Sequence, residues 1–211
     1  MEAIVGMGHF CDTHGPSVIL CTHPADGPLL KGAPVATPAC DGCRSIDDRT
    51  VLVSEGSDRC FVTTRSSMDE HVARLLKDVV LRSLSIEVVS EDAESSGSMY
   101  FGDDSRGHVI SHVFSLKDSN ARGFTRRYCL VVLGKNPISL LSHYDFIEEN
   151  LRKTGEYLRR KSEQSKAPLK PTAALAQLVD EPHVFAQLHM RFVFLLAAQI
   201  YHLEPPRAPD I

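Results

Sequence analysis

The segment from Tyr128 to Leu133 is continuously apolar, and it constrains the fold more than any other part of the chain. A strand without a polar face is typical of the interior of a sheet. The strand pattern from His108 to Leu116 precedes it, and the polar, glycine-terminated stretch from Lys117 to Gly123 joins the two. The strand from His108 to Leu116 has two apolar faces. Ile110, Phe114 and Leu116 form one face, and Val109 and Val113 form the other. We therefore expect a central β-hairpin.

Shorter apolar runs predict further strands. Ala3 to Met7 and Val18 to Cys21 flank the turn signal His14-Gly15-Pro16, which predicts an antiparallel pair. Three other short strand patterns follow: a hairpin of Val51 to Val53 with Cys60 to Thr64, the run Ile86 to Val89, and Ile138 to Leu141 after Asn136-Pro137.

Three segments have helical patterns. The first begins at Ser67 and Glu70, which have capping-box spacing, and its apolar stripe consists of Val72, Leu75, Leu76, Val79 and Val80. The second runs from about Asp145 to Lys161, with an acidic first turn that suits the helix dipole. The third opens at Pro182 and continues to about Leu203.

The order of these elements predicts an α+β fold, an antiparallel sheet with helices packed on it and an additional C-terminal helix. The length of 211 residues with 43% hydrophobic residues suits one domain of this kind rather than two. We expect this domain over residues 1–161, with a mobile loop at about 24–48 that is rich in Pro, Gly and Asp. A linker at 162–181 and the helix at 182–203 follow.

Composition excludes several function classes. A formal charge of −4 without basic clusters argues against nucleic acid as a partner. The chain contains no P-loop, no G-x-G-x-x-G and no G-x-S-x-G motif, so it lacks the signatures of NTPases, dinucleotide-binding domains and nucleophile-elbow hydrolases. Polar residues interrupt the long apolar stretch near the C-terminus, and the start has no signal-peptide pattern. We expect a cytoplasmic protein with reduced thiols and with membrane contact only through partners.

Cys40 and Cys43 form a C-x-x-C motif in a predicted loop. Two thiolates at this spacing provide half of a tetrahedral zinc site or a redox pair, and nearby thiols also occur without function. A second C-x-x-C is missing, and we see no repeat of the ligand spacing among the other candidates, which are His9, Cys11, His14, Cys21 and Cys60. We therefore expect no cofactor of the chain's own, with zinc as the alternative.

Two other groups of candidate residues have plain structural interpretations. His108 and His112 share one face of a strand, which suits a pair of metal ligands, a pH-sensitive contact or a structural role. The run from His9 to Pro16 combines His and Cys as thiol nucleophiles require, but a strand-turn-strand accounts for the same residues.

The loop from Lys117 to Phe124 presents Arg122 near the tip of the central hairpin. Arginine is planar and permanently charged, so beside a nucleotide it can neutralise the charge that develops on transferring phosphoryl oxygens. Most loop arginines are instead solvated charges or members of local salt bridges. The residues alone leave both interpretations open.

Several separated blocks of the sequence resemble the folliculin family. They are His9-Phe10-Cys11, His14-Gly15-Pro16, Cys21-Thr22, Cys40-Asp41-Gly42-Cys43-Arg44-Ser45, Arg82-Ser83-Leu84-Ser85 with Glu87, Phe101-Gly102-Asp103, Gly107, Ser111-His112, Phe114, Lys117-Asp118 and Ala121-Arg122-Gly123-Phe124. They follow the family's order from the N-terminus to roughly Leu141. Two features depart from the family: Arg127 stands where members often carry Trp, and the polar insertion before Cys40 is short.

The resemblance implies a longin domain, without room for the DENN domain that follows it in larger members. It implies pairing with a folliculin-interacting protein of the longin-DENN type. It further implies stimulation of GTP hydrolysis by a Rag/Gtr-type GTPase heterodimer at the lysosomal or vacuolar membrane, in amino-acid signalling to TORC1. The chain would be a GTPase activator rather than a stand-alone enzyme, and GTP and Mg²⁺ would belong to the partner GTPase.

The family's catalytic arginine maps onto Arg122, with Lys117, Asp118, Gly123 and Phe124 as its loop support. Two alternatives from other classes remain. One is a non-catalytic longin scaffold that docks a partner through its sheet edges, and the other is a zinc or thiol-redox module built on Cys40 and Cys43.

Overall fold

A single antiparallel sheet of seven strands organises the molecule, with the order β3-β4-β2-β1-β7-β6-β5. The computed structural model describes residues 3–25, 35, 40–47, 50–56, 59–86, 96–118, 121–165 and 173–200. The strands are β1 (Ile4–Cys11), β2 (Gly15–Ala25), β3 (Leu52–Glu55), β4 (Cys60–Thr64), β5 (Gly97–Asp103), β6 (Gly107–Lys117) and β7 (Thr125–Gly134).

The predicted hairpin of β6 and β7 is confirmed, and β7 lies in the interior of the sheet between β6 and β1. Every residue from Tyr128 to Leu133 is buried. The two predicted faces of β6 are also confirmed, because Ile110 and Phe114 belong to one hydrophobic core and Val109 and Val113 to the other.

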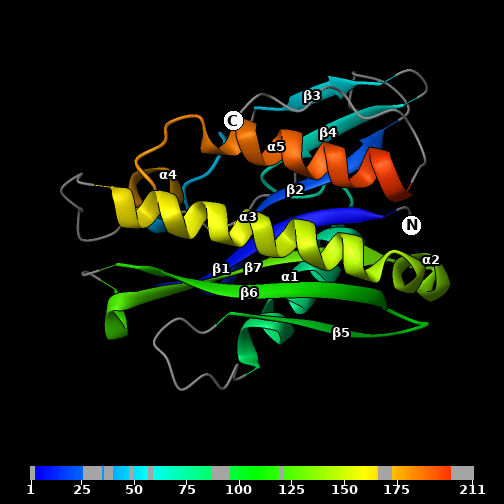
Figure 1. The fold of residues 1–211 in the computed structure, drawn as a ribbon, viewed down its shortest axis with the longest axis horizontal. Helices are drawn as coiled ribbons and strands as arrows, with labels where there is room; N and C mark the ends of the chain where they lie inside the picture. Colours follow the sequence, from blue (N-terminus) through cyan, green and yellow to red (C-terminus); the bar gives the residue numbers. More distant parts are fainter. Residues whose placement is uncertain are drawn as a thin grey trace.

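Helices cover both faces of the sheet. They are α1 (Glu70–Ser85), α2 (Pro137–Ser142), α3 (Tyr144–Gln164), α4 (Leu175–Leu178) and α5 (Val184–Leu195), which continues into the π-helical turn η3 (Leu196–Ile200). Figure 1 shows α1 behind the sheet and α3 and α5 in front of it. The result is the α+β fold expected, an antiparallel sheet between helical layers.

The additional C-terminal helix, α5, packs on the sheet and shares its core. Phe192 and Leu188 are buried together with residues of β2, β6 and β7. His189 lies within hydrogen-bond distance of two strand hydroxyls, 2.6 Å from Thr63 Oγ1 and 2.8 Å from Ser54 Oγ. Apolar burial and these two polar contacts together hold α5 against the β3–β4 edge.

The prediction of a strand at Ile138 to Leu141 is wrong, because these residues belong to α2. Asn136 caps the helix, and its side chain accepts hydrogen bonds from the backbone N–H groups of Ile138 and Ser139. Pro137 occupies the first turn, where its missing N–H costs nothing. Local capping chemistry therefore outweighs the apolar strand pattern, and the Ile138 side chain is 77% exposed.

Other boundaries also differ from expectation. Asp69 rather than Ser67 caps α1, the third helix begins at Val184 rather than Pro182, and α4 lies inside the predicted linker. Strand β5 was not predicted because it is an edge strand without an apolar alternation. Ile86, the first residue of the strand expected at Ile86 to Val89, is the C-cap of α1, and the rest of that segment lies outside the described residues. Most of the loop expected at 24–48 also lies outside them.

Among the described residues, no helix combines the length and the apolar character that crossing a bilayer requires.

Candidate functional site

The β6–β7 loop has a defined backbone conformation at both ends. Its base is closed by a hydrogen bond from the N–H of Asp118 to the carbonyl of Phe124, at 3.0 Å. Inside it, the N–H of Ala121 donates to the carbonyl of Asp118, and the N–H of Phe124 donates to the carbonyl of Ala121. Arg122 begins the short 3-10 turn η2 (Arg122–Phe124). Its backbone is therefore held at the end of the central hairpin.

The turn uses left-handed backbone at two consecutive residues. Gly123 has φ +79°, which glycine adopts without steric cost. Phe124 has φ +61°, which is uncommon for a bulky residue, and its side chain is 74% exposed. Strain of this kind is concentrated at functional sites, where the surrounding structure fixes it.

A buried ion pair stabilises the base of the loop. The Asp118 carboxylate, which is fully buried, lies 2.8 Å from the guanidinium of Arg126, which is 5% exposed. Arg126 also donates from Nη1 to the carbonyl of Ala173, next to α4. Removing one partner of such a pair costs about 3–5 kcal/mol because the other charge is left unpaired in the interior.

The structure thus brings together most of the predicted loop residues. Lys117 is exposed at the end of β6, and Asp118, Gly123 and Phe124 form the base and the turn. Sequence reasoning missed Arg126, because it precedes the apolar run at Tyr128 to Leu133 and stands beside a second arginine, Arg127, so no sequence pattern marks it as buried. Arg127, at the position of departure from the family, donates from Nη2 to the carbonyl of Ile86.

The expectation that no second pair repeats the ligand spacing of Cys40 and Cys43 is wrong. Cys11 and His14 are also separated by two residues, and the fold brings both pairs into one cluster. Cys11 ends β1 and His14 lies in the turn before β2, while Cys43 ends the 3-10 turn η1 (Asp41–Cys43). Cys21 and Cys60 lie outside this cluster.

The two sites are adjacent through Arg126. Its Nη1 would lie 3.0 Å from a Cβ atom added to Gly42, so the guanidinium packs against the backbone between the two cysteines of η1. His9 lies beside the cluster, with its ring 5.7 Å from that of Tyr128. Burial lowers the pKa of His9 to about 3, with a further contribution from the charge of Arg126, so its imidazole is neutral.

The histidine pair on β6 has the structural role. His108 lies 2.8 Å from the hydroxyl of Tyr100, and His112 lies 2.8 Å from Ser98 Oγ. Burial lowers the pKa of His112. Each imidazole has its own partner on β5, and neither is part of a metal-binding group among the described residues.

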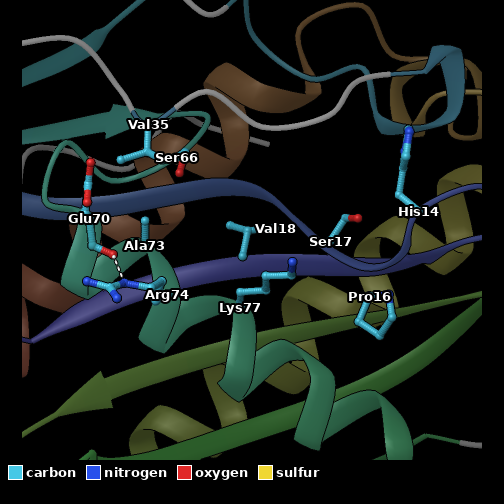
Figure 2. A pocket seen from close by; sticks show the side chains of 10 residues that line it. All are labelled: His14, Pro16, Ser17, Val18, Val35, Ser66, Glu70, Ala73, Arg74 and Lys77. Atoms are coloured by element: carbon cyan, nitrogen blue, oxygen red, sulfur yellow. Dashed lines mark hydrogen bonds between the residues drawn. The ribbon is translucent and has the colours of Figure 1, made fainter.

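A separate pocket of about 350 Å³ lies between α1 and β2. Figure 2 shows Glu70, Ala73, Arg74 and Lys77 of α1 along one side of it, while the His14 side chain points away from the other labelled residues. The pocket shares no lining residue with the β6–β7 loop.

Comparison with known proteins gives a consistent family. A family model described as "Folliculin: Vesicle coat protein involved in Golgi to plasma membrane transport" matches residues 59–199. Folliculin of Xenopus tropicalis is 25% identical over 94% of this chain and 46% of its own length. Protein LST7 of Saccharomyces cerevisiae is 32% identical over 75% of this chain and 69% of its own length.

The folliculin-like protein bhd1 of Schizosaccharomyces pombe is 36% identical over 54% of this chain and 33% of its own length. The chain spans about half the length of the vertebrate folliculins that it matches. Since the family model covers more than half of the chain and LST7 is similar over most of both lengths, the chain belongs to the folliculin family.

Proposed function

We propose that this chain is a GTPase-activating subunit that supplies Arg122 to a partner GTPase. The observation that carries the proposal is the β6–β7 loop, whose backbone is closed by its own hydrogen bonds above the buried Asp118–Arg126 pair. An arginine finger stabilises the transition state more effectively when its backbone is fixed before the reaction, because ordering it during catalysis costs free energy.

The exposed Phe124 adds a feature that suits a partner surface. The Phe124 side chain, two residues after Arg122 in the same loop, is 74% exposed and provides apolar contact area. Aromatic and arginine side chains are enriched at the energetically dominant positions of protein interfaces. The loop thus has the composition of a contact that delivers an arginine.

Family membership supports the following proposal for the partners. The chain pairs with a folliculin-interacting protein of the longin-DENN type, and the complex acts on a Rag/Gtr-type GTPase in amino-acid signalling to TORC1. GTP and Mg²⁺ are bound by the GTPase, and the complex is recruited from the cytoplasm to the lysosomal or vacuolar membrane through partners. The chain itself is not a stand-alone enzyme.

Single-turnover GTP hydrolysis by the GTPase heterodimer tests the role of Arg122. The complex of the chain with its partner should accelerate hydrolysis, and Arg122→Ala should reduce that acceleration by about 10³-fold or more, the range for arginine fingers supplied in trans. Arg122→Lys should restore little, because an ammonium group cannot reproduce the planar guanidinium. Binding of the GTPase, measured separately, should be retained.

Arg106 provides a matched control. It is an exposed loop arginine in the turn between β5 and β6, at the opposite end of β6 from Arg122. Arg106→Ala should leave the hydrolysis rate unchanged. If Arg122→Ala hydrolyses GTP at the wild-type rate with full binding, the assignment of Arg122 is wrong.

A second candidate function is a non-catalytic scaffold, favoured by the two sheet edges β3 and β5. Edge strands present backbone groups that pair with a strand of another chain, so a longin module can dock a partner through them. Under this alternative the complex assembles and Arg122→Ala has no effect on hydrolysis. The same assay therefore separates the two functions.

A further inference from the structure

Four potential metal ligands converge at the end of β1. They are Cys11, His14, Cys40 and Cys43, and their ligand atoms all lie within 4.8 Å of one another. Each pair comes from one short stretch of chain: Cys11 ends β1 and His14 lies in the β1–β2 turn, while Cys40 caps η1 and Cys43 ends it. Two turns that are far apart in the sequence therefore present their side chains to one point.

Four of the six separations between the ligand atoms have the size of the edges of a coordination tetrahedron, and the other two are at most 4.8 Å. Zinc binds sulfur at about 2.3 Å and imidazole nitrogen at about 2.0–2.1 Å, so ideal edges are about 3.8 Å between two sulfurs and about 3.6 Å between sulfur and nitrogen. Cys11 Sγ lies 3.5 Å from Cys40 Sγ, and Cys40 Sγ lies 3.7 Å from Cys43 Sγ. His14 Nδ1 lies 3.6 Å from Cys11 Sγ and 3.4 Å from Cys43 Sγ.

The same distances disfavour a disulfide. A bonded pair of sulfurs is separated by about 2.05 Å, and all six cysteines of the chain are free. Three thiols and an imidazole around one point form a mixed soft donor set, and zinc is the metal that such sets bind most often in tetrahedral structural sites.

The surroundings suit a closed site with negative charge. Three thiolates, a neutral histidine and Zn²⁺ carry a net charge of −1. The Arg126 guanidinium, which packs on Gly42 between Cys40 and Cys43, contributes positive charge nearby. His9 Nε2 lies 3.2 Å from Cys43 Sγ, where an N–H donor would stabilise a metal-bound thiolate.

The backbone of η1 is arranged as a metal-binding turn requires. The N–H of Cys43 donates to the carbonyl of Cys40 at 3.0 Å, which curls the segment so that both side chains point to the same side. Cys11 and Cys43 are buried at 5% and 1% exposure, while His14 and Cys40 are half-buried. Four protein ligands leave no coordination position for water, which is the arrangement of structural rather than catalytic zinc.

We propose that Cys11, His14, Cys40 and Cys43 bind one structural zinc ion. The ion ties η1 to the β1–β2 turn. Because Arg126 packs against Gly42, the ion also stabilises the buried Asp118–Arg126 ion pair at the base of the β6–β7 loop. The zinc assignment does not depend on the proposed GTPase activity, because the ion would tie η1 to the β1–β2 turn equally in a chain that only docks partners.

Metal analysis of the 211-residue chain, purified under reducing conditions from zinc-supplemented medium, tests the proposal. We expect about one zinc per chain, and X-ray absorption at the zinc edge should show about three sulfur neighbours near 2.3 Å and one nitrogen near 2.0 Å. His14→Cys should keep the zinc and change the pattern to four sulfurs. Cys40→Ser combined with Cys43→Ser should lose it.

Cys60→Ser is the matched control, because Cys60 is a half-buried thiol of β4 outside the cluster. It should keep the full zinc content. Wild-type chain with less than about one-tenth equivalent of zinc, or zinc without three sulfur ligands, would overturn the four-ligand assignment. So would a Cys40–Cys43 disulfide found by mass spectrometry under the same conditions. The wild-type measurements decide the question even if the double variant fails to fold.

Discussion

Gly123 controls the conformation of the β6–β7 loop through its backbone alone. Its φ of +79° lies in the left-handed region, and a Cβ atom added there meets no atom within 4 Å. Any effect of a substitution on stability therefore comes from the backbone preference and not from a clash.

We predict that Gly123→Ala lowers the free energy of unfolding by about 1 kcal/mol, the cost of left-handed backbone for an L-residue. Gly123→Asn should lose less, because asparagine adopts this conformation more readily. Urea unfolding curves of the three proteins measure the differences. Equal losses for the two variants would show that side-chain crowding, and not φ, is responsible.

At the scale of elements, the packing of α1 against the sheet depends on a close approach at Gly8 of β1. A Cβ atom at Gly8 would lie 2.4 Å from Cγ1 of Val80, which is a severe overlap. Both residues belong to the buried layer between helix and sheet. The helix can lie this close only because β1 has no side chain there.

We predict that Gly8→Ala destabilises the fold by about 1–3 kcal/mol, the usual cost of overpacking a core. Adding Val80→Ala removes the overlapping methyl groups, so the double variant should lose less than the sum of the two single variants. Gly134→Ala of β7 is the control, since its Cβ would meet Leu140 at an ordinary 3.4 Å. Strict additivity in thermal or urea unfolding would contradict the close-approach explanation.

The β6–β7 hairpin and η1 form a second unit at the element scale. Asp118 and Arg126 join the loop base to β7, and Arg126 reaches the backbone of both Gly42 and Ala173. One guanidinium thus links three segments that are distant in the sequence. This explains why a buried arginine is tolerated inside a strand whose other inward residues are apolar.

At the scale of the whole molecule, His189 makes the attachment of α5 to the sheet sensitive to acid. Burial lowers its pKa from 6.5 to about 4. Between these two values the unfolded chain binds more protons than the folded one, so stability decreases as the pH falls from about 6.5 to 4. Above pH 6.5 the contribution of the neutral His189 to the free energy of unfolding is fully present.

We predict that His189→Gln, which retains hydrogen-bonding atoms for Thr63 and Ser54 without titrating, flattens this pH dependence. Between pH 7 and pH 4 the wild type should lose about 2–3 kcal/mol more than the variant, since one pKa unit corresponds to about 1.4 kcal/mol. The comparison cancels contributions shared by both proteins, including that of His9. Urea unfolding at a series of pH values measures it, and parallel pH curves would contradict the prediction.

Much of the architecture follows from the sequence because it depends on local periodicity. The apolar run at Tyr128 to Leu133 determines an interior strand, and the two apolar faces of β6 require a helical layer on each side. Local periodicity did not predict edge strand β5 or helix α2. The first takes its partners from β6, and the second depends on one capping side chain, Asn136.

Strand periodicity and turn chemistry act between neighbouring residues, so the α+β class, the central hairpin and the position of Arg122 in its loop can all be predicted from the sequence. The joining of Cys11 and His14 with Cys40 and Cys43, and the pairing of Arg126 with Asp118 beside them, depend on tertiary contacts. Spacing along the chain reveals ligand pairs. Their convergence depends on strand pairing, which brings the C-terminal end of β1 and the N-terminal end of β7 to the same end of the sheet.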